Sequence, residues 1–227
     1  MPIAIGTVAV LILLAVAATW PGFYPDRIAV SGNQRVTRSE ILAAAAVAPN
    51  VSIWFQNTGA MARRIEAIPY IETTDVHRAL PASIRIVVVE RAPFAVLRSG
   101  ASAAVVDRSL RVLEPATGTD LLPTLDVEPG LNFLPGEYVR ARHAIELGDC
   151  YVAIAGRRID PRELGFDRFG GLVVTLRGGL RLLLGADNDL GPKLTLADAI
   201  LSQVVGGQRR VAAIDLRAPA APVVVYR

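Results

Sequence analysis

IAVSGNQRVTRSEILAAAAV, residues 28–47, carries the local signals of a strand, a turn and a helix in direct succession. The Gly-Asn pair follows a short β-branched run, and both residue types tolerate the positive φ that tight turns use. Thr37 and Glu40 have capping-box spacing, in which each side chain accepts a hydrogen bond from the backbone N–H of the other residue. This stretch therefore predicts a strand-turn-helix unit whose helix covers 38–47 and ends before Pro49.

Downstream of this stretch, the sequence predicts a second helix and two further strands. Asn57 is typical of a helix N-cap, and apolar residues recur at helical spacing through 58–67. The runs 70–79 and 84–91 are rich in β-branched residues and indicate strands. The aromatic rings of the apolar link 52–55 are expected to pack under the module. The order strand, helix, helix, strand, strand favours two helices on one face of a three-stranded sheet.

The chain opens with an apolar run, residues 3–19, that carries no charge. With Trp20 and the flanking prolines it approaches the roughly 20 residues that span a bilayer core. We therefore expect an uncleaved transmembrane anchor over 1–24, in which Ile3 to Trp20 tethers the rest of the chain to the membrane. The alternative is a cleaved signal peptide with small residues at 15–17, but no positively charged segment precedes the run. The first aromatic residues after the run would form an interfacial belt: Trp20, Phe23 and Tyr24.

From Pro93 onward, short apolar runs alternate with turns, which predicts a β-rich second domain. Helices are expected over 138–155 and 192–205, and Gly178-Gly179 between two apolar runs indicates a hairpin. The last expected strand, Val223–Tyr226, has no following residues to cover its outer edge. We expect an α+β protein with three parts: an anchor at 1–24, a domain at 25–92 and a β-rich domain at 93–227.

Composition excludes several functional classes. The 227 residues carry a net charge of +3 with scattered arginines, so the basic stripe of a nucleic-acid protein is missing. Cys150 is the only cysteine, and the two histidines, His77 and His143, show no metal-ligand spacing. No phosphate-binding glycine loop or nucleophile motif occurs. We expect no catalytic residue, cofactor or metal; a Cys150 nucleophile assisted by His143 is the disfavoured alternative to a buried structural cysteine.

Several stretches together resemble the FtsQ/DivIB family of bacterial cell-division proteins. Beyond 28–47 and the SIW at 52–54, they are IEAIPYIETTDVHRALPASIRIVVVERAPFAVL (65–97), VVDRSLRVLEP (105–115), LPTL (122–125) and AAIDLRAPAAPVVV (212–225). The resemblance implies one membrane span, a POTRA domain and a β-rich domain ending in an edge strand. Family members usually carry a cytoplasmic tail, whereas Met1 here sits at the edge of the expected span.

The resemblance also implies a non-enzymatic divisome scaffold. It would bind FtsB/FtsL-type partners and help to recruit and regulate septal peptidoglycan synthesis, with most of the chain outside the inner membrane at the septum. In such proteins an FtsB strand pairs with the terminal edge, here Val223, Val224, Val225 and Tyr226. Arg217 matches the arginine that contacts an acidic partner residue, and Arg168 would act with it. The alternatives are a POTRA protein of a translocation or assembly system and a membrane-anchored envelope enzyme.

Overall fold

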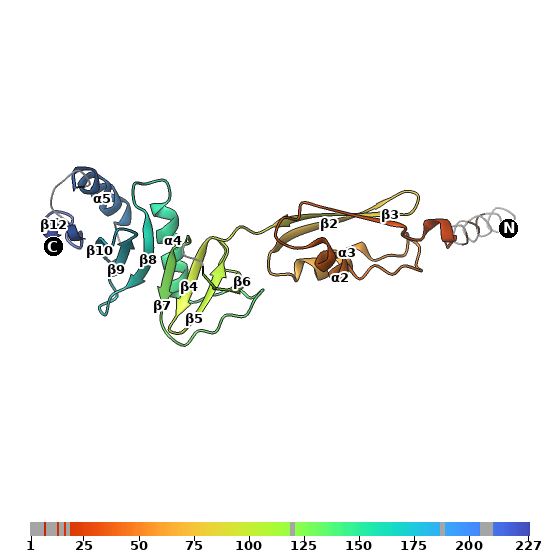
Figure 1. Cartoon of the computed structure of the whole chain (residues 1–227), viewed down its shortest axis with the longest axis horizontal. Helices are drawn as coiled ribbons and strands as arrows, with labels where there is room; N and C mark the ends of the chain where they lie inside the picture. The colour runs from red at the N-terminus through yellow and green to blue at the C-terminus, as the bar shows by residue number, and fades with distance from the viewer. Residues whose placement is uncertain are drawn as a thin grey trace. The chain divides into compact units, whose positions relative to one another are not determined.

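The computed structural model describes residues 19–118, 121–186, 189–204 and 211–227, together with Thr7, Leu13 and Val16. The chain divides into two compact units, Met1–Ala92 and Pro93–Arg227 (Figure 1). Each unit has its own hydrophobic core.

The predicted transmembrane anchor, Ile3 to Trp20, falls mostly outside the described residues. Among the residues that the structure does describe, no helix combines the length and apolar character that a membrane crossing requires. Trp20 leads into the short 3-10 helix η1 (Pro21–Phe23), and Tyr24 is already extended.

The first unit follows the predicted order of strand, helix, helix, strand, strand (Figure 1). Its elements are β1 (Arg27–Ser31), α2 (Arg38–Ala45), α3 (Thr58–Glu66), β2 (Ile71–Ala79) and β3 (Ser83–Glu90). β3 lies in the middle of the three-stranded sheet, parallel to β1 and antiparallel to β2. Ile41 of α2 and Ile65 of α3 are fully buried in one core with Ile84 and Ile86 of β3. The predicted α+β class is confirmed.

Helices α2 and α3 begin at their predicted caps. Thr37 Oγ1 accepts a hydrogen bond from the backbone N–H of Glu40 at 3.2 Å, and the Asn57 side chain caps α3 in the same way. The predicted extension of the first helix to Val47 is wrong. Ala46 has a φ of 48°, in the left-handed region, so α2 ends one residue before it.

The aromatic rings of the link 52–55 do not pack under the module, contrary to prediction. Ile53 is fully buried, whereas Trp54 and Phe55 are exposed. The backbone of Ile53 is held on both sides: its N–H donates to the Phe23 carbonyl at 2.8 Å, and its carbonyl accepts from Arg78 Nε at 2.7 Å. Ile53 is thereby fixed as the inward residue of the link.

Two distant motifs of the first unit meet at Glu90, at the end of β3. Glu90 Oε1 accepts hydrogen bonds from the backbone N–H groups of Gln34 at 2.8 Å and Val36 at 2.9 Å. Glu90 Oε2 accepts from the N–H of Arg35 at 2.9 Å. Burial acts to raise the pKa of Glu90, but the three N–H groups and the Arg35 charge outweigh it and hold the pKa below its usual value. This contact, named here the Glu90 clamp, joins the turn before α2 to the last strand of the unit.

The second unit is a nine-stranded sheet in the order β12-β11-β10-β9-β8-β7-β4-β5-β6. Its strands are β4 (Ala95–Ser99), β5 (Ser102–Val106), β6 (Val112–Pro115), β7 (Thr124–Val127), β8 (Pro161–Phe166), β9 (Leu172–Leu176), β10 (Arg181–Gly185), β11 (Val211–Asp215) and β12 (Val223–Tyr226). Its helices are α4 (Arg142–Ile154) and α5 (Leu190–Val204). The predicted hairpin is β9 and β10, which pair antiparallel.

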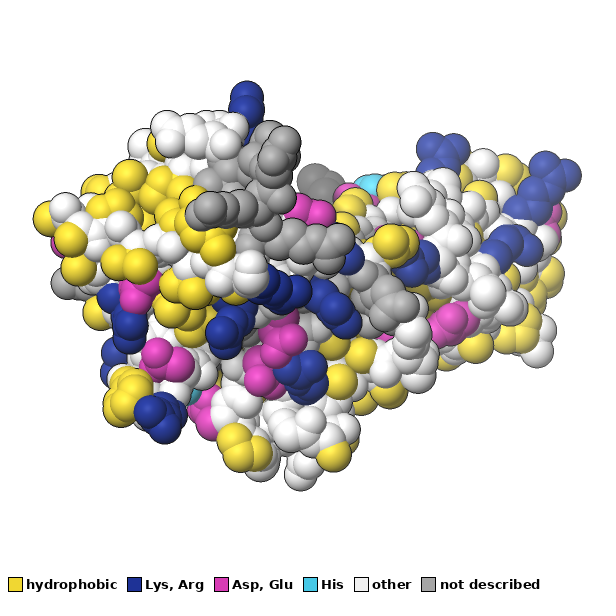
Figure 2. Space-filling view, turned by 60° about the vertical axis from the view of Figure 1, so that its left-hand side comes forward, with side chains coloured by type: hydrophobic (Ala, Val, Ile, Leu, Met, Phe, Trp, Pro, Cys, Tyr) yellow, Lys and Arg dark blue, Asp and Glu magenta, His cyan; other side chains and the backbone are white. Residues whose placement is uncertain are grey.

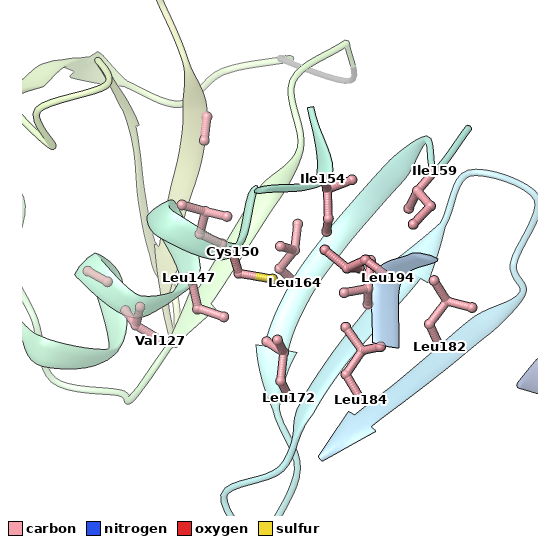
Figure 3. Close-up of a cluster of buried hydrophobic side chains, with 14 of the residues drawn as sticks. Val127, Leu147, Cys150, Ile154, Ile159, Leu164, Leu172, Leu182, Leu184 and Leu194 are labelled. Atoms are coloured by element: carbon pink, nitrogen blue, oxygen red, sulfur yellow. The ribbon is translucent and has the colours of Figure 1, made fainter. Parts of the chain in front are cut away.

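Both helices of the second unit pack into a single core (Figure 3). Leu147 and Cys150 of α4 point toward Leu164 of β8, and Leu194 of α5 lies beside Leu182 and Leu184 of β10. All but Cys150 are fully inaccessible to solvent, and Cys150 is nearly so.

Three elements of the second unit differ from their predictions. β8 is not expected from the sequence, although it is a central strand between β7 and β9. α4 begins at Arg142 rather than Tyr138, because residues 136–139 bond to the β6 region instead. α5 begins at Leu190, two residues before the predicted Pro192.

Candidate partner-binding edge

The two edges of the nine-stranded sheet differ in how they are protected. At the β6 edge, the backbone N–H of Val112 donates to the Glu137 carbonyl at 2.8 Å, and the Val112 carbonyl accepts from Gly136 N–H at 2.8 Å. The strand ends in Pro115, which has no N–H to offer a further strand. The β6 edge is therefore short, partly paired and proline-terminated, as protected edges usually are.

The β12 edge has no such cover within the described residues. β12 pairs antiparallel with β11 on its inner side, with Val224 opposite Ile214 and Val223 opposite Asp215. No strand pairs with its outer side in the described part of the chain. Val223 is 54% exposed and Val225 is 47% exposed, so apolar side chains remain accessible along this edge.

Arg217, just after β11, is held by Asp215. The Arg217 Nε lies 3.0 Å from both carboxylate oxygens, and Nη2 donates to Oδ2 at 2.5 Å. The pKa of Asp215 lies below its usual value because the Arg217 guanidinium donates to it, against the opposing effect of burial. Arg217 Nη1 makes no hydrogen bond within the described residues, so Asp215 orients the guanidinium and leaves donors available.

A pocket of about 510 Å³ opens beside Arg217. Its walls come from the β8–β9 turn, the end of β10 and the start of α5; the lining residues are Asp167, Phe169, Gly170, Gly171, Gly185, Ala186, Lys193 and Arg217. Lys193 is almost fully buried, and its Nζ donates to the Ala186 carbonyl at 2.7 Å. Two cationic side chains therefore line one pocket, and Asp215, which holds Arg217, is paired with Val223 at the start of β12.

The second predicted arginine, Arg168, lies in the same turn as the pocket wall. Its guanidinium sits 4.7 Å from the centre of the Phe169 ring, which is 78% exposed. Backbone N–H groups of Gly171 and Phe169 lower the pKa of Asp167 against burial, and the charges of Arg217 and Arg168 lower it further. Both predicted arginines thus lie within electrostatic range of Asp167.

Asp167, Phe169, Lys193 and Asp215 were missed from the sequence, although the last two leave a signal. Asp215 and Arg217 are two positions apart at a strand end, the spacing that places side chains on one face. Lys193 precedes the buried Ala197 and Leu201 by four and eight residues, which assigns it to the inward face of α5.

The disfavoured thiol chemistry has no support in the geometry. Burial raises the pKa of Cys150 to about 12, so the thiol remains protonated at neutral pH. His143 Nδ1 lies 2.9 Å from Glu128 Oε2, and its ring contacts Phe166. In the described part of the chain, no three acidic, histidine or cysteine side chains form a group that could hold a metal ion.

The surface charge of the molecule is mixed in sign. Basic and acidic side chains lie side by side on the face shown in Figure 2, with no single-sign stripe on that face. Charges of both signs also pair in the second unit, where Arg98 of β4 lies 3.0 Å from Asp126 of β7 and 2.5 Å from Glu163 of β8. The face shown in Figure 2 therefore lacks the basic stripe that is typical of a nucleic-acid-binding protein.

Comparison with known proteins identifies relatives along most of the chain. A family model for the POTRA domain, FtsQ-type, matches residues 23–91. The cell division protein FtsQ of Streptomyces collinus is 26% identical over 94% of this chain and 84% of its own length. That of Agrobacterium fabrum is 27% identical over 86% of this chain and 59% of its own, and that of Rhizobium meliloti is 27% identical over 65% and 49%. The chain thus spans about half the length of the Rhizobium relative.

Proposed function

This chain belongs to the FtsQ family of cell division proteins, and on that basis we propose that it is a non-enzymatic scaffold of the bacterial division machinery. Its partners would be FtsB/FtsL-type division proteins, through which it helps to recruit and regulate septal peptidoglycan synthesis. The proposal divides the chain into an anchor at 1–24, a POTRA domain at 25–92 and a partner-binding domain at 93–227. The observation that carries it is the β12 edge, which no strand covers within the described residues and which exposes apolar side chains.

The partner would add a strand to the outer side of β12. An unpaired sheet edge offers a row of backbone donors and acceptors, and an extended peptide can satisfy them while its side chains contact the strand. Val223 and Val225 are about half exposed, so a partner strand would remove apolar surface from water as well. The protected β6 edge of the same sheet supports β12 as the docking side.

An acidic side chain of the partner would enter the pocket beside this edge. Arg217 is oriented by Asp215 yet retains Nη1 for a second carboxylate, and Lys193 contributes another positive charge to the lining. Asp167 also lines the pocket, so a single carboxylate must approach from the Arg217 side. Arg168 and Phe169 would form the outer rim.

The scaffold would work outside the cytoplasmic membrane, tethered by the uncharged run from Ile3 to Trp20. Long segments translocate largely regardless of their charge, so the charged residues of 25–227 present no obstacle to export. Protease added to spheroplasts should degrade the chain beyond Trp20. Survival of that part alongside an intact cytoplasmic marker would reverse the orientation.

Binding to the extracytoplasmic part of an FtsB-type partner tests the docking edge directly. Val224→Pro removes a backbone donor from β12 and should abolish binding, and Arg217→Gln should weaken it and reduce its sensitivity to salt. Arg181→Gln is the matched control, because Arg181 is an exposed arginine at the opposite end of β10 from Gly185, which neighbours Arg217. Circular dichroism melting would verify that each variant is folded. Equal binding by the wild type and by both folded β12-edge variants would refute the proposed site.

A further inference from the structure

Four aromatic residues lie at one end of the first unit: Trp20, Trp54 and Phe55, whose side chains are exposed, and the partly buried Phe23. The Trp20 and Phe23 rings meet edge to face at 6.2 Å between centroids, and the Phe23 and Trp54 rings do so at 6.2 Å. Trp20 is 66% exposed, Trp54 is 47% exposed, and the adjacent Phe55 is 58% exposed. We name these four residues the aromatic row.

The aromatic row is assembled by the fold from two segments that lie far apart in the sequence. Trp20 and Phe23 flank and end η1, while Trp54 and Phe55 belong to the link before α3. The Ile53 N–H donates to the Phe23 carbonyl at 2.8 Å, which ties the two segments together. Arg78 of β2 donates to the carbonyls of Ile53 and Gln56, both at 2.7 Å, so the link is held on either side of the exposed rings.

The β2–β3 turn lies at the same end of the unit as η1 (Figure 1). The backbone N–H of Asp26 donates to the Ala82 carbonyl at 2.9 Å, which joins the segment after η1 to this turn. Leu80, in the turn, is 67% exposed. One end of the unit therefore presents aromatic and aliphatic side chains from three separate segments.

A group of exposed tryptophan and phenylalanine rings held in place indicates an interaction surface, because soluble domains seldom keep large contiguous apolar patches in water. The sequence indicates what this surface contacts. The uncharged run 3–19 ends immediately before Trp20, so the aromatic row begins at the residue where the proposed span leaves the hydrocarbon. Tryptophan side chains are enriched at that depth of a bilayer, where the apolar ring contacts lipid and the indole N–H can bond to water or headgroups.

We propose that the aromatic row docks the first unit onto the lipid headgroup layer. Trp54 and Phe55 enter the interface beside Trp20, so the unit is held at a fixed orientation to the bilayer instead of swinging on a single-residue tether. Asp26 and Arg27, the charged residues that follow η1, remain in water at the rim. This inference rests on the proposed membrane anchor, since the anchor brings the row to the bilayer.

The chain contains only two tryptophans, and both belong to the row. Trp20→Phe leaves Trp54 as the sole tryptophan fluorophore, and Trp54→Phe leaves Trp20. Each full-length variant would be reconstituted into phosphatidylcholine and phosphatidylglycerol vesicles containing lipid brominated near the headgroup or near the chain end. As a control, Phe169→Trp on a background lacking both tryptophans places the fluorophore at an exposed aromatic position of the second unit.

Trp54 should lose much of its emission to lipid brominated near the headgroup, and less to lipid brominated near the chain end. The control tryptophan should lose little to either, and should be quenched by acrylamide from the water. If Trp54 behaves like the control, the docking inference is overturned, and the surface is open to a protein partner. The quenching of Trp20 separates the two proposals. If Trp20 is not quenched, the membrane anchor is refuted; if Trp20 is quenched and Trp54 is not, only the docking inference is refuted.

Discussion

The Glu90 clamp should supply a large share of the stability of the first unit, and Glu90→Gln tests this with little change in shape. A hydrogen bond to a charged acceptor contributes about 1.5–3 kcal/mol, against about 0.5–1.5 kcal/mol for a neutral one. Gln is neutral and keeps only one acceptor oxygen. Its amide nitrogen takes the place of the second carboxylate oxygen, so a donor nitrogen there faces a backbone N–H, which is also a donor. Over three bonds the nominal loss is about 3 kcal/mol, which we reduce to about 2 kcal/mol because Glu90 is only partly buried.

That loss matters for a unit of this size. Small domains have about 5 kcal/mol of total stability, so ~2 kcal/mol is a considerable part of it. It corresponds to a fall in melting temperature of roughly 10 °C. Tryptophan emission measures the unit specifically, since both tryptophans, Trp20 and Trp54, lie within Met1–Ala92. The protein would be unfolded by denaturant in mild detergent, which keeps the apolar N-terminal run soluble.

The pH dependence gives the clamp a distinct signature. The pKa of Glu90 is lower in the folded protein than in the unfolded chain, so the clamp contributes fully above the unfolded value of about 4.3. As the pH falls through the folded pKa, the carboxylate takes up a proton and the contribution is lost. The difference between wild type and Glu90→Gln should therefore be greatest near neutral pH and shrink in acid.

Glu72→Gln is the matched control, because Glu72 is an exposed glutamate of β2 in the same sheet. It should leave the unfolding midpoint within about 0.5 kcal/mol of wild type. If Glu90→Gln and Glu72→Gln unfold at the same denaturant concentration at pH 7, the clamp contributes nothing and the reasoning fails.

Two further predictions concern single positions. Gly32 has a φ of 90°, and a Cβ there would lie 2.0 Å from the Val88 carbonyl oxygen, so Gly32→Ala should unfold the first unit by tryptophan emission. At Gly59 in α3, a Cβ would make only ordinary van der Waals contacts, at 3.7 Å from side-chain atoms of Asn57 and Arg63. Gly59→Ala should therefore stabilise the unit by about 0.5–1 kcal/mol, and destabilisation by both variants alike would contradict the steric argument. Cys150, buried and protonated, should resist a thiol reagent at pH 8 until denaturant is added; rapid labelling of the native protein would show that α4 does not seal it.

The sequence predicts the first unit well because its signals are local. Thr37 and Asn57 cap their helices through side chains that bond within three residues, and such spacing can be read directly from the chain. The inward position of Ile53 could not be read in this way. It depends on the Phe23 carbonyl and on Arg78, which the fold brings together from 30 residues before and 25 after.

The strand missed in the second unit shows a different limit. β8 begins with Pro161 and contains Gly165, two residue types that are depleted in strands. Proline is tolerated at the first position of a strand, and a Cβ at Gly165 would meet the Asp126 Cβ at 3.4 Å. These residues suit β8 to its place between two neighbours, and only the assembled sheet reveals that place.

The candidate site was likewise predictable from the sequence only in part. β12 was predicted from its β-branched composition and its terminal position, while the pocket beside it depends on residues from a turn, a strand end and a helix. Arg168 and Arg217 are 49 positions apart, and nothing in their spacing indicates that Asp167 lies within range of both charges. The antiparallel pairing of β8, β9 and β10 and the parallel pairing of β10 with β11 bring the β8–β9 turn and the end of β11 to the same end of the sheet.

The motifs that carry the family resemblance turn out to have internal structural roles. Glu90 of the ER-x-P motif bonds the backbone of the G-N-x-R-V turn, so these two motifs are the halves of one contact. Asp107 of the V-V-D motif accepts from the backbone N–H groups of Ser109 and Arg111 and closes a turn. Arg217 of the I-D-L-R motif is first held by its own Asp215. Residues used in this way specify the fold. The choice of partner should therefore depend on surfaces that stay accessible in the described part of the chain: the exposed side chains of Val223 and Val225, the Arg217 Nη1 and the exposed Phe169 ring.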